Sequence, residues 1–83
     1  MKLKDTCKMM ESEDFKERFR AEYFQAKIRA EKLAAMLEKY KANILPFRPN
    51  CSYELLFEQL LYMIQYLRIL EERAEVENIG LEE

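Results

Sequence analysis

Two cations and two aromatic rings stand close together in the first third of the sequence. Arg20, Phe24 and Lys27 follow one another at spacings of four and three residues, so on a helix their side chains are surface neighbours. Tyr23 directly precedes Phe24. Arginine and lysine side chains neutralise phosphate groups, and nucleobases stack on aromatic rings. This group of residues is therefore typical of a nucleotide-binding site.

Two residues further along the chain extend this candidate ligand site. Gln59 and Tyr66 carry side chains that hydrogen-bond a base or a ribose. Each candidate also has a structural alternative. Phe24 and Ile28 would join a subunit interface, either tyrosine would line the edge of a core, and the charged and amide side chains would be solvated. The binding hypothesis depends on the clustering of these residues and not on any one of them.

The elements that must position these residues are two long helices. Apolar residues alternate at spacings of three and four in both, which predicts helices that pack along their length. We expect one helix over about 15–43, a proline-containing connection over 44–51 and a second helix over about 53–79. Asp14 and Ser52 are the expected N-caps, and Gly80 suits the left-handed turn that ends the second helix. The fold class is all-α, with residues 14–81 forming an antiparallel helical hairpin.

Residues 1–13 leave two alternatives open. Leu3, Cys7 and Met10 fall on one helical face, which favours a short helix that docks on the hairpin. Terminal segments are also commonly frayed, so a loose tail fits equally well.

The second helix is more apolar than a hairpin requires. Beside its packing seam it carries two further apolar stripes, which are Phe57, Leu61 and Ile64 on one side and Leu55, Tyr62, Tyr66 and Ile69 on the other. A helix that is apolar nearly all round is buried on several sides. A chain of 83 residues has too little other mass to cover those sides. We therefore expect a multimeric helical bundle, in which the extra stripes form subunit contacts or a ligand site.

Charge and composition exclude several functions. Residues 1–49 carry a net charge of +4 and residues 50–83 a net charge of -6. A nucleic-acid footprint is normally more basic, so we expect no DNA partner. The chain has no histidine and a single glycine, which disfavours nucleophilic catalysis and a phosphate-binding loop. We expect no enzyme activity, no metal and no cofactor. Two cysteines without metal-like spacing and no long apolar run indicate a cytoplasmic protein that does not enter a membrane.

The sequence also resembles a known family. The run from Phe15 to Leu33 is similar to the first helix of small helical-hairpin proteins of phages and prophages. The second helix is similar at Leu56, Gln59, Leu60, Met63, Tyr66, Leu67, Leu70, Glu71, Arg73, Ala74 and Glu77. This resemblance covers residues 14–81. Its relatives include the sponges that counter CBASS and Thoeris immunity, which sequester cyclic oligonucleotide or cyclic ADP-ribose-type signals as multimers with pockets between protomers.

The resemblance implies a counter-defence protein in the cytoplasm of an infected bacterial host. It would bind a cyclic nucleotide signal without cleaving it and assemble with copies of itself, with a hexamer as one candidate size. The expected ligand-binding residues follow from the chemistry of their side chains and not from the resemblance; they are Arg20, Tyr23, Phe24, Lys27, Gln59 and Tyr66. A second hypothesis is a small coiled-coil interaction protein that binds no small molecule. A third is a prophage-encoded regulator or assembly factor that does not sequester a ligand.

Overall fold

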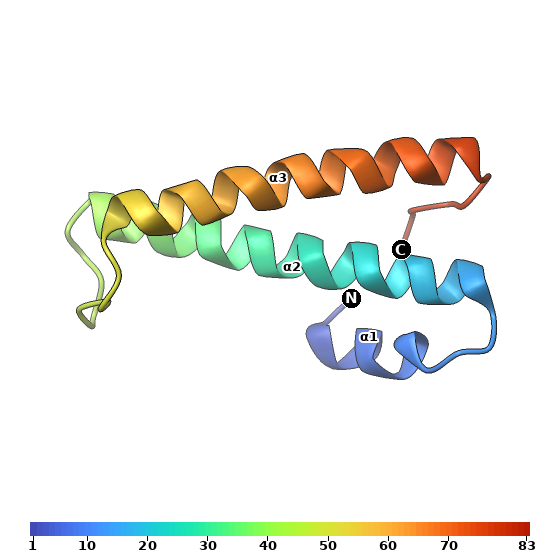
Figure 1. Ribbon diagram of the computed structural model, residues 1–83. Helices are drawn as coiled ribbons and strands as arrows, with labels where there is room; N and C mark the ends of the chain where they lie inside the picture. The colour runs from blue at the N-terminus through green and yellow to red at the C-terminus, as the bar shows by residue number, and fades with distance from the viewer.

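The computed structural model describes residues 1–83 and consists of three helices without strands. Helix α1 spans Leu3–Met10, α2 spans Phe15–Lys41 and α3 spans Tyr53–Val76. Helix α2 lies in the middle, with α3 packed along one side and α1 on the other (Figure 1). The predicted all-α helical hairpin is confirmed. The short N-terminal helix also exists, which decides between the two alternatives for residues 1–13.

The predicted apolar seam joins α2 to α3. Leu60, Leu70 and Ala74 of α3 are buried against α2, where Ala30 and Leu37 are among the buried residues. Removing these side chains from water is the main force that holds the pair together. A cross-helix contact shows how the two helices are aligned along their length. The ring centroid of Tyr40 lies 5.7 Å from that of Tyr53 near one end of the hairpin.

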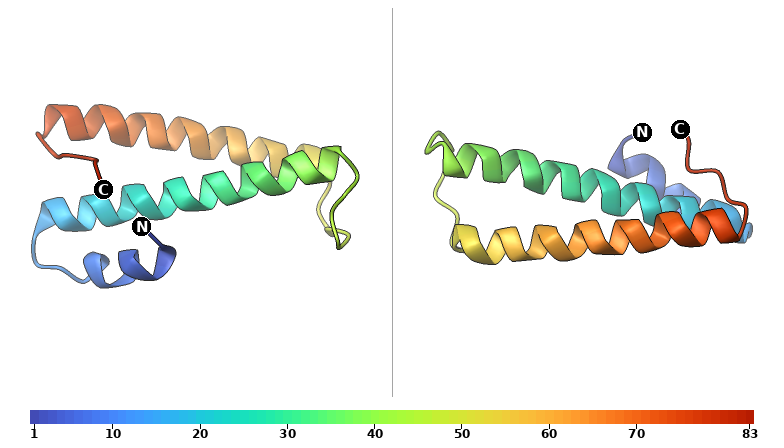
Figure 2. Two further views of the ribbon diagram at one scale, coloured as in Figure 1. Left: turned by 180° about the vertical axis from the view of Figure 1, so that it is seen from behind. Right: turned by 90° about the horizontal axis from the view of Figure 1, so that it is seen from above.

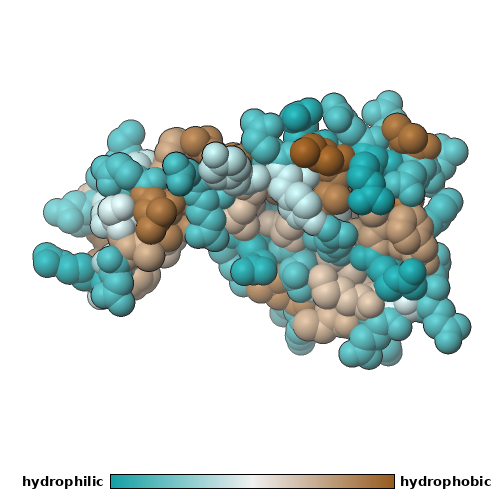
Figure 3. Space-filling view, in the orientation of Figure 1, coloured by the Kyte–Doolittle hydropathy of each residue, from teal (hydrophilic) through white to brown (hydrophobic).

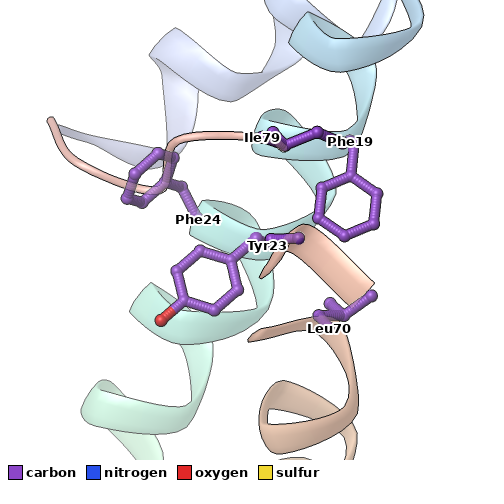
Figure 4. Close-up of a cluster of buried hydrophobic side chains, with 6 residues drawn as sticks. Phe19, Tyr23, Phe24, Leu70 and Ile79 are labelled. Carbon is purple, nitrogen blue, oxygen red and sulfur yellow. The ribbon is translucent and has the colours of Figure 1, made fainter. Parts of the chain in front are cut away.

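The core is thickest at the end of the hairpin that carries α1. A cluster of six buried side chains gathers there, and five of them are labelled in Figure 4: Phe19, Tyr23, Phe24, Leu70 and Ile79, with Ala74 as the sixth. The connection end holds the smaller cluster of Ala30, Leu37 and Leu60. Burial is therefore concentrated where α2, α3 and the C-terminal residues meet.

The two long helices end earlier than predicted, and for the same reason. Helix α2 ends at Lys41 and α3 at Val76, each followed two residues later by an asparagine with positive φ, Asn43 (61°) and Asn78 (57°). The next amide N–H then bonds back into the helix, as from Ile79 to the Ala74 carbonyl at 2.8 Å. The prediction that Gly80 makes this turn was wrong. Asparagine also tolerates the left-handed conformation, and stopping at Asn78 lets Ile79 enter the core.

Helix α1 uses a different face from the predicted one. Thr6 is completely buried, with Leu3 and Met9 partly buried beside it, whereas Cys7 and Met10 are exposed. The Thr6 hydroxyl donates a hydrogen bond to the Leu3 carbonyl at 2.7 Å. A hydroxyl with a hydrogen-bond partner can be buried without penalty. Thr6 therefore occupies the contact position that the apolar spacing predicted for Cys7.

A broad apolar surface remains exposed along α3. Tyr62 is 72% exposed and Leu61 is 48% exposed, although both belong to the predicted extra stripes. The other large apolar side chains exposed on this helix are Leu55, Phe57, Ile64, Tyr66, Ile69 and Val76. Brown, apolar atoms reach the surface along the upper edge in Figure 3, over α3. No helix of the chain combines the length and the apolar character that a membrane span needs.

Candidate functional site

The predicted pair of a cation and an aromatic ring exists, but it lies inside the protomer. The guanidinium carbon of Arg20 is 5.7 Å from the centroid of the Phe24 ring, which is within reach of a cation–π interaction. Phe24 is only 2% exposed. Its ring lies beside the C-terminal segment in the core cluster (Figure 4). In the isolated protomer the ring therefore offers no open face on which a base could stack.

A C-terminal strap, residues 77–83, covers Arg20. From the end of α3 it turns back across α2 and brings the chain's two ends together, as all three views show (Figures 1 and 2). Arg20 Nη2 donates to the Glu82 carbonyl at 2.6 Å, and Lys16 Nζ donates to the Asn78 carbonyl at 3.3 Å. Ile79 and Leu81 pack against the core cluster. The strap was not predicted, because it carries no periodic pattern.

Tyr23 connects the two long helices. Its hydroxyl donates a hydrogen bond of 2.7 Å to the Glu71 carboxylate, and its ring packs edge-on against Phe24 with the centroids 5.4 Å apart. Burial and the nearby Glu71 carboxylate raise the pKa of the Tyr23 phenol to about 12. The structural alternative for Tyr23, a core-edge residue, describes this geometry.

The raised pKa of Tyr23 predicts a pH dependence of stability. The phenol ionises near pH 10 in the unfolded chain, against about 12 in the folded one. The contribution of its hydrogen bond to the free energy of unfolding is therefore full below pH 10 and is lost as the pH rises through about 12. Urea unfolding of the parent protein and of Tyr23→Phe should differ at neutral pH, and the difference should vanish at strongly alkaline pH. A difference that stayed constant would contradict the Tyr23–Glu71 bond.

The remaining predicted residues are on the surface. Lys27 is exposed and forms no ion pair. Tyr66 is 43% exposed, and the exposed Gln59 amide makes only a weak contact of 3.8 Å with the Met63 sulfur. The register of the hairpin places Lys27 level with Tyr66, with Gln59 two turns nearer the connection. These three side chains are available to a ligand.

Helical geometry divides the predicted residues between two flanks of the hairpin. Lys27 follows Tyr23 by one turn, and Tyr23 contacts Glu71, so these residues share one flank. At heptad spacing from Glu71, the same flank carries Ile64 and Phe57. Arg20 and Phe24 also lie toward it, and we call this side the Lys27 flank.

The opposite side of the α3 seam forms a second flank, which we call the Tyr66 flank. It carries Gln59, Tyr66 and Arg73, which are spaced by seven residues. One protomer therefore does not unite all the predicted residues.

Arg73 has a structural role on the Tyr66 flank. Its guanidinium carbon lies 4.9 Å from the centroid of the Phe19 ring, and its Nη2 pairs with a Glu77 carboxylate oxygen at 3.0 Å. A surface hollow of about 770 Å³ lies elsewhere, at the loop between residues 40 and 52. None of the predicted ligand residues lines it. This hollow follows from the extended path of the proline-containing connection, and we assign it no ligand.

Comparison with known protein families identifies a match. The model of a protein family described as Sequestin matches residues 13–76, which contain both long helices and their connection. Neither the curated proteins nor the solved structures gave a match. The matched range includes every predicted ligand residue and leaves α1 and the whole strap outside.

Proposed function

The chain belongs to the Sequestin family, and from this premise we propose that it binds a cyclic nucleotide immune signal and holds it without cleaving it. The family match is the observation that carries this proposal, because its name fits proteins that retain a ligand instead of converting it. The protein would act as a counter-defence factor of a phage or prophage in the cytoplasm of an infected bacterium. Its ligand would be a cyclic oligonucleotide or a cyclic ADP-ribose-type molecule.

The exposed residues of the two flanks have the chemistry that such a ligand needs. Lys27 supplies a free cation for a phosphate group, and Tyr66 offers an aromatic face and a hydroxyl. Gln59 has both donor and acceptor atoms for a base edge. Sequestration requires only binding, for which complementary cations and stacking surfaces are enough. This set supplies both and would not break a phosphodiester bond.

We propose that self-assembly brings the two flanks together. On one protomer Lys27 and Tyr66 point to opposite sides, so a pocket that uses both takes the Lys27 flank of one copy and the Tyr66 flank of another. The exposed apolar side chains of α3 supply the driving force, because burying apolar surface contributes about 25 cal/mol per Å². The expected product is a homo-oligomer with ligand sites between protomers.

Leu61→Arg is expected to reduce the assembled mass. Leu61 is 48% exposed in the protomer, and a charge at this position would have to be buried unpaired in an apolar interface. Size-exclusion chromatography with light scattering measures the effect. Glu58→Arg is the matched control, since Glu58 is exposed on the same helix between the two apolar stripes and forms no ion pair. A parent protein that is fully monomeric would already contradict self-assembly.

Sequestration is tested by recovering the ligand. The protein is incubated with cyclic di- and trinucleotides and cyclic ADP-ribose isomers, separated from free ligand and then denatured. Chromatography of the released material should return one nucleotide chemically intact, in a fixed ratio to protein. Recovery of linear or hydrolysed products would contradict sequestration without cleavage.

The exposed apolar surface also favours a second candidate function. A coiled-coil interaction protein would bury the same α3 residues against a different protein and would need no small molecule. The large apolar residues at the connection, Ile44 and Phe47, are exposed as well and would extend such an interface. Under this alternative, Leu61→Arg would release a protein partner while Lys27→Glu would change nothing.

A further inference from the structure

The strap consists of an anchored part and a weakly held part. Ile79 is 6% exposed within the core cluster, and its N–H bonds to the Ala74 carbonyl. Beyond it, residues 80–83 are held by the half-buried Leu81, by the hydrogen bond from Arg20 to Glu82, and by an exposed ion pair of 3.1 Å between Glu83 and the Met1 amino group. Exposed ion pairs contribute little stability. The last four residues can therefore leave while Ile79 stays in place.

The only glycine of the chain lies at the junction between these two parts. Gly80 is exposed, and no atom lies within 4 Å of the position that a Cβ would occupy there. Packing does not fix the backbone at this point, and glycine has the widest choice of backbone conformations. Gly80 is thus placed to act as the hinge of the distal strap.

Arg20 is poorly satisfied by the strap that covers it. A guanidinium has five N–H groups arranged for planar, two-point recognition of carboxylate or phosphate. In the protomer the strap offers it a single neutral carbonyl, that of Glu82, and Arg20 Nε is buried with no hydrogen-bond partner. A buried donor without a partner costs stability. A phosphate group would offer several charged oxygens to the same guanidinium.

The strap also has the charge of a competitor for an anion. Its distal acidic residues, Glu82 and Glu83, lie over a surface that presents Arg20 and the Met1 amino group. Lys16 adds a further cation, which contacts the Asn78 carbonyl of the strap. An anion that approached Arg20 would repel this segment and take over its cation contact. Arg20 precedes Lys27 by two turns on the same flank, so a freed Arg20 would extend the cationic surface of that flank.

We propose that residues 80–83 are a built-in competitor for an anion-binding site at Arg20. When a phosphate group binds the Arg20 guanidinium, it replaces the Glu82 carbonyl, and the distal strap swings away about Gly80 while Ile79 stays buried. The identity of the natural ligand rests on the proposed function, under which it is a phosphate-containing nucleotide. The competition between the strap and an anion does not depend on that function, because any phosphate group of sufficient charge would take part.

Nuclear magnetic resonance of the 15N-labelled full chain tests the competition, with the heteronuclear NOE of each amide as the measure of local mobility. The probe is inorganic tripolyphosphate, which has no base or ribose, compared with sodium chloride at equal ionic strength. Tripolyphosphate should lower the heteronuclear NOE of residues 80–83 and leave those of α2 and α3 high, whereas sodium chloride should not. In Arg20→Gln residues 80–83 should be mobile before any addition and should not respond further. Lys39→Gln, which removes an exposed charge near the far end of α2, should respond like the parent protein.

Gly80→Ala tests the hinge in a variant that keeps every strap contact. An alanine fits without a clash and restricts the backbone of the freed strap, so the tripolyphosphate concentration that releases half of the strap should rise by about 2- to 5-fold. The inference is overturned if the mobility of residues 80–83 ignores tripolyphosphate, responds equally to sodium chloride, or loses its response in Lys39→Gln. Cyclic nucleotide retention with an unresponsive strap contradicts this inference alone. A responsive strap in a protein that retains no nucleotide contradicts the proposed function alone.

Discussion

Replacing Phe24 by alanine is expected to lower the free energy of unfolding by about 3–5 kcal/mol, the usual cost of removing a buried phenylalanine ring. The ring is almost completely buried, and it packs against Tyr23 within the core cluster. Domains of this size have stabilities near the low end of about 5–15 kcal/mol, so the loss would unfold a measurable fraction of the protein. Urea unfolding followed by circular dichroism measures it.

Phe24→Leu separates the packing role of this ring from a role in stacking on a base. Leucine keeps most of the apolar volume, and such exchanges usually cost less than about 1.5 kcal/mol. We expect this variant to fold and to retain nucleotide, because the ring is enclosed within the protomer. Loss of retention in folded Phe24→Leu would show that the ring contacts the ligand. A loss of under 1 kcal/mol in Phe24→Ala would contradict its burial.

Lys27→Glu is expected to abolish nucleotide retention without unfolding the protein. Lys27 is exposed and unpaired, so its replacement removes no contact that holds the fold. Losing one partner of a buried charge pair in a complex costs about 2–5 kcal/mol, and an added carboxylate would also repel phosphate. Affinity should therefore fall by at least about 30-fold. Isothermal titration calorimetry with the retained nucleotide measures the loss, and circular dichroism checks the fold.

Two further variants make the Lys27 result specific. Lys39→Glu makes the same change of charge at an exposed position of α2 three turns away, and it should keep nearly full affinity at physiological salt. Lys27→Arg keeps the charge and should keep most of the binding. Unchanged affinity in Lys27→Glu would remove Lys27 from the site. An equal loss in Lys39→Glu would show that only the overall charge matters.

The hairpin could be predicted from the sequence because the apolar residues of both long helices recur at regular spacing. The three–four spacing in both long helices identified the residues that α2 and α3 bury against each other, and the extra stripes of α3 identified its exposed apolar surface. The contacting face of α1 was missed because Thr6 satisfies its hydroxyl within its own helix. Apolar spacing alone does not reveal such a residue.

The candidate site was predictable only in part. Spacing along one helix correctly brought Arg20 next to Phe24. It did not show that the strap would cover Arg20, because Arg20 and Glu82 are 62 positions apart and nothing local signals their contact. The separation of Lys27 from Tyr66 follows from the antiparallel register once the Tyr23–Glu71 contact is known. Single-helix patterns contain no such information about opposing flanks.

Native mass spectrometry tests nucleotide sequestration by an assembly most directly. The full-length protein is sprayed alone and with a panel of cyclic di- and trinucleotides and cyclic ADP-ribose isomers. We predict a multimer that gains the mass of one intact nucleotide species at a fixed stoichiometry. A well-defined multimer that ignores the whole panel would contradict nucleotide sequestration and would favour the protein-interaction alternative.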